Sequence, residues 1–175
     1  MTTPTPSHKK SPAASGSAAG KTTDAIALLK ADHAEVKKCF KAYQKLVDAE
    51  AEADERRELA EQICSLLSVH ATIEEEIFYP AARAVLGDEV DLMDEADVEH
   101  ASAKELIAQI RSMGPDGDHY DAKVKVLGEY IDHHVEEEQD EMFPKAKKAG
   151  LDTAAIGKEL VARKEELMRE ERVHA

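Results

Sequence analysis

The sequence predicts an all-α protein, an up-down-up-down four-helix bundle with an additional C-terminal helix. Three observations predict this fold. Aromatic residues make up only 4% of the 175 residues, whereas Ala, Leu, Glu and Lys, which form helices readily, are abundant. Apolar residues recur at intervals of three and four, which places them on one face of a helix. The sustained alternation of apolar and polar residues that is typical of a half-buried strand is absent from the sequence.

The first two predicted helices begin at polar residues and end at breaking residues. Asp24, or the threonine before it, can cap a helix that reaches residue 48, because its side chain accepts a hydrogen bond from a free backbone N–H. A second helix begins near Asp54 and runs to residues 80–86, where Gly87 interrupts it.

Two further helices complete the predicted bundle, and a fifth follows it. The third extends from about Glu89 to the turn-forming segment 113–118, and the fourth from about His119 to Phe143-Pro144. Because the connections are short, we expect sequential helices to pack as antiparallel neighbours. After Gly150 the apolar residues form a rough stripe, which predicts an amphipathic helix that packs across the bundle or extends from it.

The beginning of the chain has a different composition from the rest. Residues 1–23 are rich in Pro, Ser, Thr, Gly and Ala, and they contain three lysines and no acidic residue. Such a segment cannot bury a core. We therefore expect a disordered basic tail over residues 1–23, the bundle over residues 24–148, and the C-terminal amphipathic helix over residues 149–175.

Charge and composition restrict the classes of partner. A net charge of −14 repels phosphate backbones and anionic lipid, so we expect neither nucleic acid nor a membrane as a partner. The tail lacks the apolar stretch of a signal peptide, and no apolar run approaches the length of a membrane span. Cys39 and Cys64 are too few for a disulfide framework or a thiolate metal motif, so a cytoplasmic location is expected.

Each of the four predicted bundle helices places one histidine in the apolar stripe that should be buried, and two of them add a glutamate one turn later. These six residues are His33, His70, Glu74, His100, His134 and Glu138. Segments 70–80 (HATIEEEIFYP) and 134–144 (HVEEEQDEMFP) align on His, Glu and Pro, with an aromatic residue before each proline. We expect the prolines to end or kink their helices beyond the six residues, and the aromatic residues to close that end of the bundle.

The six residues predict a metal site. An unpaired carboxylate in an apolar interior is costly, and the inward cations available to offset it are imidazoliums, which burial disfavours. Four nitrogen and two oxygen ligands without a thiolate fit iron, manganese or zinc. Two carboxylates shared among four histidines suit two ions about 3.5–4 Å apart. Such an arrangement leaves coordination positions open, which is typical of sites that react or bind a gas.

This pattern, with an aromatic-Pro pair after each glutamate, resembles the haemerythrin-like, or HHE cation-binding, family over residues 24 to about 148. The resemblance implies a non-haem di-iron centre inside the bundle. It implies that the histidines of the first two helices hold one iron, that those of the last two hold the other, and that the two glutamates bridge them. Whether an oxo or hydroxo group also bridges the two irons stays open.

Two positions depart from the oxygen-carrying haemerythrins. Those proteins have a further histidine one turn before that of the third helix, where this chain has Ala96. They also have an aspartate five residues after the histidine of the fourth helix, where this chain has Gln139. Six ligands in place of seven argue against reversible O₂ carriage and leave the iron more open to peroxide, nitric oxide or water.

Several neighbouring residues are candidates for supporting roles. His133 is rotated about 100° from His134 on the helix and is expected to face solvent or to support the ligands. Tyr130 either reaches an open iron position or bonds elsewhere in the core, and Asp97 and Glu99 can orient a ligand imidazole. The other acids near the site are expected to form a solvated face: Glu75, Glu76, Glu136, Glu137 and Asp140.

Three functions stay open on these grounds. The first is a di-iron protein that binds or processes O₂, peroxide or nitric oxide in a stress response; whether it has a weak peroxidase-, catalase- or nitric oxide-processing activity is undecided. The second is iron sequestration or delivery, and the third is a regulatory bundle that the metal only stabilises. The sequence assigns no catalytic residue and no protein partner.

Overall fold

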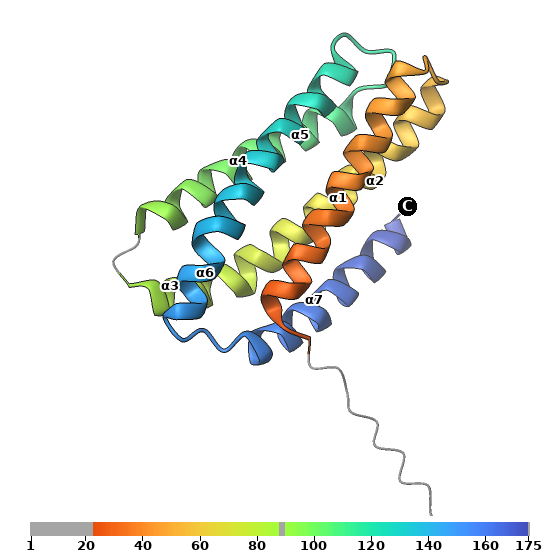
Figure 1. Cartoon of the computed structure of the whole chain (residues 1–175). Helices are drawn as coiled ribbons and strands as arrows, with labels where there is room; N and C mark the ends of the chain where they lie inside the picture. The colour runs from red at the N-terminus through yellow and green to blue at the C-terminus, as the bar shows by residue number, and fades with distance from the viewer. Residues whose placement is uncertain (1–22, 88–89, 175) are drawn as a thin grey trace, which may run out of the picture.

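The computed structural model describes residues 23–87 and 90–174, and every regular element among them is helical, which confirms the all-α prediction. Figure 1 shows the elements in chain order. They are α1 (Ala25–Asp48), α2 (Ala53–Ile73), η1 (Glu74–Phe78), α3 (Tyr79–Leu86), α4 (Val90–Ser112), α5 (Tyr120–Glu137), η2 (Glu138–Met142), α6 (Phe143–Lys148) and α7 (Thr153–His174). All but the last residue of the predicted tail lie outside the described residues.

The long helices form two antiparallel pairs. Helix α1 packs on α2 and α5, and α4 packs on α5 and α2. Consecutive long helices run in opposite directions (Figure 1). Asp24 caps α1, because its Oδ1 accepts a hydrogen bond from the N–H of Ala27 at 2.9 Å. Gly87 ends α3 with a φ of 58°, a backbone conformation that glycine adopts without steric cost.

The buried apolar side chains form two clusters, and the predicted histidines lie between them. Along α1, His33 lies between Leu29 of one cluster and Val36 of the other. The histidines of α2, α4 and α5 likewise have a residue of one cluster before them and a residue of the other cluster after them in the chain. The bundle therefore has a thin polar layer between two apolar layers, so any charge in it is far from water on both sides.

Both helices that carry a predicted glutamate ligand contain a π-helical turn that begins at that glutamate. The N–H of Tyr79 bonds to the carbonyl of Glu74, and the N–H of Phe143 bonds to the carbonyl of Glu138, each five residues back. A proline follows each turn. In a regular α-helix a proline ring clashes with the carbonyl four residues earlier, and the wider turn relieves that clash.

The prolines consequently do not end their helices, which corrects that part of the expectation. Pro80 lies in the first turn of α3, which continues to Leu86, and Pro144 lies in the first turn of α6, which continues to Lys148. Each helix can continue through its proline because the π turn before it relieves the clash of the ring.

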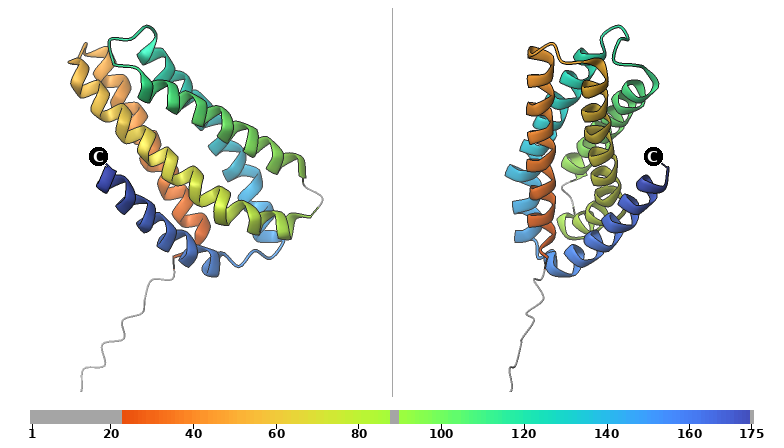
Figure 2. Two further views of the ribbon diagram at one scale, coloured as in Figure 1. Left: turned by 180° about the vertical axis from the view of Figure 1, so that it is seen from behind. Right: turned by 90° about the vertical axis from the view of Figure 1, so that its right-hand side faces the viewer.

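Helix α7 lies obliquely against the outside of α1 and α2 (Figure 2). Its Leu160 is fully buried in the cluster that also holds Leu29 and Phe143. Gly157 lets the start of α7 approach the start of α1, because a Cβ there would lie 1.9 Å from the carbonyl oxygen of Thr23. None of the helices in residues 23–87 and 90–174 is both long and apolar enough to cross a membrane.

Replacing Gly157 with alanine is expected to destabilise the protein by about 1–3 kcal/mol, because the clash is with backbone that cannot rotate away. Helix propensity alone would predict a gain of up to about 1 kcal/mol, so the sign separates the two effects. Urea unfolding followed by circular dichroism measures the change. Gly114→Ala is the control, since its added Cβ meets nothing within 4 Å, and a stabilised Gly157→Ala would contradict the packing described.

Candidate metal centre

The structure brings all six predicted residues together in the polar layer of the bundle. Each of the six side chains belongs to a residue that is at most 6% exposed. His33 of α1 and His70 of α2, here called the α1–α2 pair, have their Nε2 atoms 2.9 Å apart. His100 of α4 and His134 of α5, the α4–α5 pair, have their Nε2 atoms 3.1 Å apart.

The two glutamates lie between these pairs and reach both. Glu74 places Oε1 3.2 Å from Nε2 of His70 and Oε2 3.4 Å from Nε2 of His100. Glu138 places Oε2 3.2 Å from Nε2 of His33 and 3.6 Å from Nε2 of His134. A carboxylate that contacts both pairs can bridge two metal ions, one held by each pair.

Carboxylates outside the cluster fix the orientation of three of the four imidazoles. Nδ1 of His134 lies 2.7 Å from Glu99, and Nδ1 of His100 lies 3.0 Å from Glu75. Nδ1 of His70 lies 3.5 Å from Asp32, at the limit of hydrogen-bond distance. A carboxylate only accepts, so these contacts favour the tautomer in which Nδ1 carries the proton and Nε2 has a free lone pair.

The fourth imidazole faces an amide. Nε2 of Gln139 lies 3.0 Å from Nδ1 of His33, and a half-turn of the amide puts its oxygen at the same place. Gln139 directly follows Glu138, just as Glu75 follows Glu74. The outer partners therefore repeat with the internal repeat of the sequence, except that one acid is replaced by an amide.

The donor set fits metal cations. The tautomers above point Nε2 lone pairs at one another and at carboxylate oxygens. Both oxygens of Glu74 and one oxygen of Glu138 have no hydrogen-bond donor among the described residues, and both side chains are at most 1% exposed. Buried lone pairs without donors are costly, and cations placed among them remove that cost.

The same charges shift the pKa values of the cluster. Burial alone would lower the pKa of His70, but the carboxylates of Glu74 and Asp32 outweigh it and raise that pKa to about 10. Burial likewise raises the pKa of Glu74, but His70 and His100 overcome it and hold that pKa well below its usual range. The centre thus favours positive charge strongly, and protons and metal ions compete for the same atoms.

The two aromatic residues that precede the prolines lie against the cluster, one at each pair. Phe143 stacks on His33, with ring centroids 6.0 Å apart and planes 6° apart. The hydroxyl of Tyr79 donates to Oε1 of Glu138 at 2.9 Å and lies 3.0 Å from Nε2 of His100. In a regular α-helix residues five apart point about 140° apart, so the π turn is what brings Tyr79 to the side of Glu74.

A small cavity of about 30 Å³ adjoins all four histidines. Its other walls are mostly apolar side chains, including Val36, Leu67, Ile107 and Ile131. Since a water molecule needs about 10–15 Å³ of such space, the cavity has room for one or two molecules of that size.

The structure corrects three expectations about neighbouring residues. Tyr130 is 47% exposed and is not a core residue. Asp97 pairs with Arg83 and not with an imidazole. Glu75, expected on a solvated face, contacts His100.

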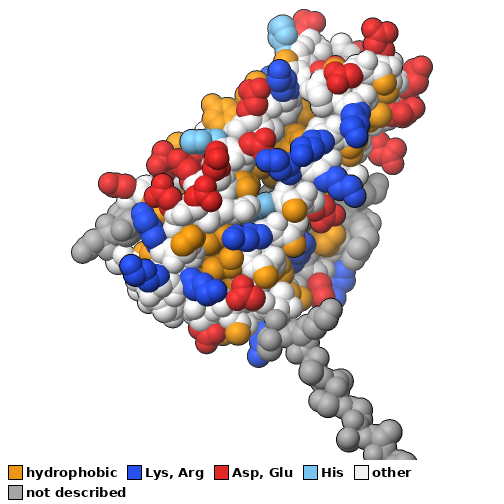
Figure 3. Space-filling view, in the orientation of Figure 1, with side chains coloured by type: hydrophobic (Ala, Val, Ile, Leu, Met, Phe, Trp, Pro, Cys, Tyr) orange, Lys and Arg blue, Asp and Glu red, His pale blue; other side chains and the backbone are white. Residues whose placement is uncertain are grey.

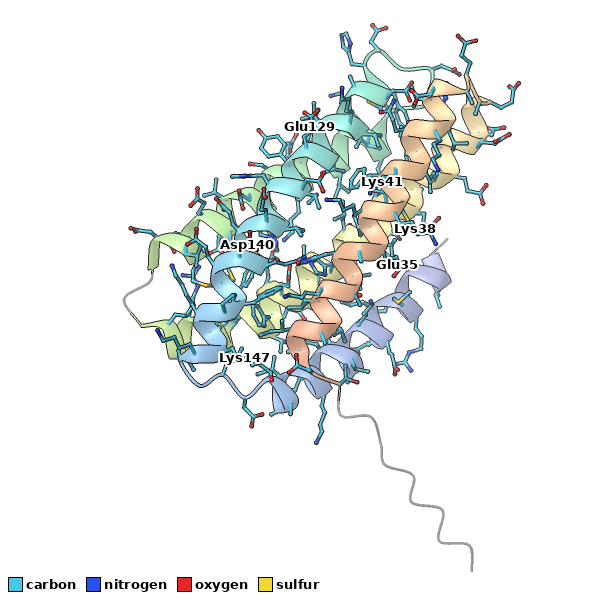
Figure 4. All side chains as sticks on the ribbon, in the orientation of Figure 1. Glu35, Lys38, Lys41, Glu129, Asp140 and Lys147 are labelled. Carbon is cyan, nitrogen blue, oxygen red and sulfur yellow. The ribbon has the colours of Figure 1, made fainter. Side chains whose placement is uncertain are left out.

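The other corrections concern residues that sequence reasoning did not single out as partners of the ligands. Asp32 directly precedes His33, and Gln139 and Glu75 directly follow the two glutamates, so adjacency to a ligand is the signal that would have found them. The expectation that Glu99 can orient a ligand imidazole is confirmed, while His133 is exposed and faces Glu137 at 3.3 Å. Asp140 points away from the cluster on the outer side of η2 (Figure 4).

Ala96, which stands where oxygen-carrying haemerythrins have a seventh ligand, is buried in the bundle. Ala96 is 3% exposed and belongs to the same buried cluster as Tyr79. The hydroxyl of Tyr79 lies beside the α4–α5 pair, 3.0 Å from Nε2 of His100 and 3.3 Å from Nε2 of His134.

Comparisons with known proteins agree with this architecture. The family model described as Hemerythrin HHE cation binding domain matches residues 24–146, which excludes α7. A crystal structure of an HHE cation-binding domain-containing protein from Mycobacterium kansasii superposes with a TM-score of 0.67 at 21% identity, covering 82% of this chain and 86% of that one. A DNA nickase from Nostoc sp. is 29% identical over 118 residues, which are 66% of this chain and only 31% of that protein.

Proposed function

The chain belongs to the haemerythrin HHE cation-binding domain family, and we propose that it is a non-haem di-iron protein that binds or processes a small oxidant such as peroxide, nitric oxide or O₂. One observation carries this proposal. Four imidazole nitrogens and two carboxylates meet in a single buried cluster that contains three carboxylate oxygens without a donor among the described residues.

The residues that would hold the metal follow from the distances. The α1–α2 pair would hold one iron and the α4–α5 pair the other, with both glutamates shared. Bound iron would supply redox chemistry and electrophilic positions for a small ligand. The histidines are oriented in advance by their outer partners, which limits the reorganisation that metal binding requires.

The size and polarity of the cavity support a small ligand. About 30 Å³ beside the four histidines accommodates a diatomic molecule or hydrogen peroxide and excludes a branched organic peroxide. The apolar walls limit the entry of bulk water. The hydroxyl of Tyr79 lies next to the cluster and can donate a proton to a ligand bound beside the α4–α5 pair.

We do not extend the DNA activity of the Nostoc protein to this chain. The matched segment is less than a third of that protein. A net charge of −14 opposes binding of a phosphate backbone, and Figure 3 shows acidic and basic side chains interspersed on the visible face.

The test is the metal content and the ligand response of the purified protein. We expect about two irons per chain after anaerobic loading with ferrous iron, because each histidine pair offers one position. After oxidation, near-ultraviolet bands should shift on addition of peroxide, azide or nitric oxide, and tert-butyl hydroperoxide should react much more slowly than hydrogen peroxide.

Other outcomes would favour the remaining candidates. Two irons that exchange rapidly with chelators, without ligand-induced spectral change, would indicate sequestration or delivery. A spectrally silent zinc pair would indicate a metal that only stabilises the bundle. Zero or one metal ion in a fully helical protein would contradict the paired site.

A further inference from the structure

The outer partners of the four histidines differ between the two pairs. Both histidines of the α4–α5 pair have a carboxylate close to Nδ1, at 2.7 Å for His134 and 3.0 Å for His100. In the α1–α2 pair, Nδ1 of His33 faces the uncharged amide of Gln139, and Nδ1 of His70 is 3.5 Å from the nearest oxygen of Asp32. The two pairs thus have the same ligands, but the residues that contact the Nδ1 atoms of those ligands differ.

Helix α7 increases this difference. Lys164 of α7 contacts the other oxygen of Asp32 at 2.5 Å, and its side chain is only 22% exposed. The carboxylate behind His70 is therefore neutralised by a partly buried ammonium group. This helix lies outside the segment that the family model matches.

The groups that contact the Nδ1 atoms of the α4–α5 pair carry more negative charge than those of the α1–α2 pair. Glu75 has a lysine partner too, since Lys104 contacts it at 2.5 Å, but the Lys104 side chain is 49% exposed and its charge is better screened by water. Glu99 has no lysine or arginine among its described ion-pair partners, which are His133 and His134. With histidines neutral, the groups that support the α1–α2 pair (Gln139, Asp32 and Lys164) have a formal charge of zero. Those that support the α4–α5 pair (Glu75, Lys104 and Glu99) have a formal charge of −1.

A carboxylate at Nδ1 makes the imidazole a stronger electron donor through Nε2, and loss of such a partner typically weakens metal binding about 10–100-fold. We propose that the two metal positions are inequivalent: the position of the α4–α5 pair holds its ion tightly, and that of the α1–α2 pair is the exchangeable one. This inference rests on the proposed metal pair, and it goes beyond it in assigning which ion leaves first.

The test is the kinetics of metal removal, which does not depend on any activity. The protein loaded anaerobically with two ferrous ions is mixed with excess of a coloured ferrous chelator. We expect two phases of equal amplitude whose rates differ about 10-fold or more. Gln139→Glu should slow the fast phase about 10-fold, and Glu99→Gln should speed the slow phase, while Gln44→Glu, which adds the same charge at an exposed position of α1, should change neither.

A measurement on the native chain keeps the test independent of how the variants fold. A crystal grown with one equivalent of Zn²⁺ should give its anomalous peak at His100 and His134 and little at the α1–α2 pair. Two bound ions that leave in a single phase, or a zinc peak at the α1–α2 pair, would overturn the inequivalence and leave the metal pair intact. A chain that never binds more than one ion would overturn both proposals.

Discussion

Glu138→Ala is expected to reduce bound iron from about two ions to fewer than one per chain. The side chain is 1% exposed, and its Oε2 lies 3.2 Å from Nε2 of His33 and 3.6 Å from Nε2 of His134, so it serves both positions. Its removal deletes a shared ligand and one of the two negative charges that offset the cations. Iron content after loading and desalting measures the effect.

His133→Ala is the matched control for this prediction. His133 neighbours the ligand His134 in sequence, but its side chain is 61% exposed and contacts Glu137 and not the cluster. We expect native iron content in this variant. Glu138→Gln, which keeps the shape and loses the charge, should fall between the two. Equal retention of iron in Glu138→Ala and His133→Ala would mean that α5 and η2 present a different face to the site.

Loss of the Glu138 carboxylate should not unfold the metal-free protein. In the metal-free protein Oε2 of this buried carboxylate lacks a donor, and removing the group relieves the cost of burying that oxygen unpaired. Circular dichroism of the metal-free variant should therefore show native helicity, which separates loss of the metal site from loss of the fold.

Tyr79→Phe is expected to slow the reaction with hydrogen peroxide about 100-fold, with iron content changed less than twofold. The phenol lies 3.0 Å from Nε2 of His100 and 3.3 Å from Nε2 of His134, so a ligand beside that pair would be within reach of its proton. Burial, together with the charges of Glu74 and Glu138, raises the pKa of Tyr79 well above its usual value, which keeps the hydroxyl protonated near neutral pH. Loss of a general acid typically costs about 10²–10⁴ in rate.

Stopped-flow mixing with peroxide at matched iron loading measures this rate. Tyr43→Phe is the control, because Tyr43 is also buried and hydrogen-bonded, but it lies near the C-terminal end of α1 and donates to Asp121 of α5. Each variant loses one buried hydroxyl and leaves one carboxylate oxygen without its donor, so their stabilities should fall by similar amounts, about 1–3 kcal/mol. A Tyr79→Phe protein that reacts at the native rate would remove Tyr79 from the reaction.

The sequence by itself determined the helices and the membership of the cluster. A histidine and a glutamate four residues apart lie on one face of a helix whatever surrounds it, so His70 with Glu74 and His134 with Glu138 were recognisable from spacing alone. Their place in an apolar stripe identified the face that is buried. These inferences succeeded because they depend on local geometry, which neighbouring residues along the chain fix.

The error over Tyr130 shows where local geometry stops being decisive. Tyr130 and Ile131 both lie within a turn of His134, but they are about 100° apart on the helix. The buried stripe of α5 passes through Leu127 and His134, and α1 and α4 flank it so that Tyr130 is left 47% exposed. The spacing of apolar residues in the sequence indicates which face of a helix is buried. The packing of the neighbouring helices decides how wide that buried face is.

Apart from Glu99, the residues that support the ligands were decided only by the tertiary structure. Asp32, Glu75 and Gln139 are ordinary polar residues in the sequence, and each acquires its role because a helix crosses at the right height to bring an imidazole Nδ1 to it. The approach of Lys164 to Asp32 depends on α7 lying across α1, over a separation of 132 residues. Such contacts depend on crossing angles and heights between helices, and these result from the packing of the whole core, which no single segment specifies.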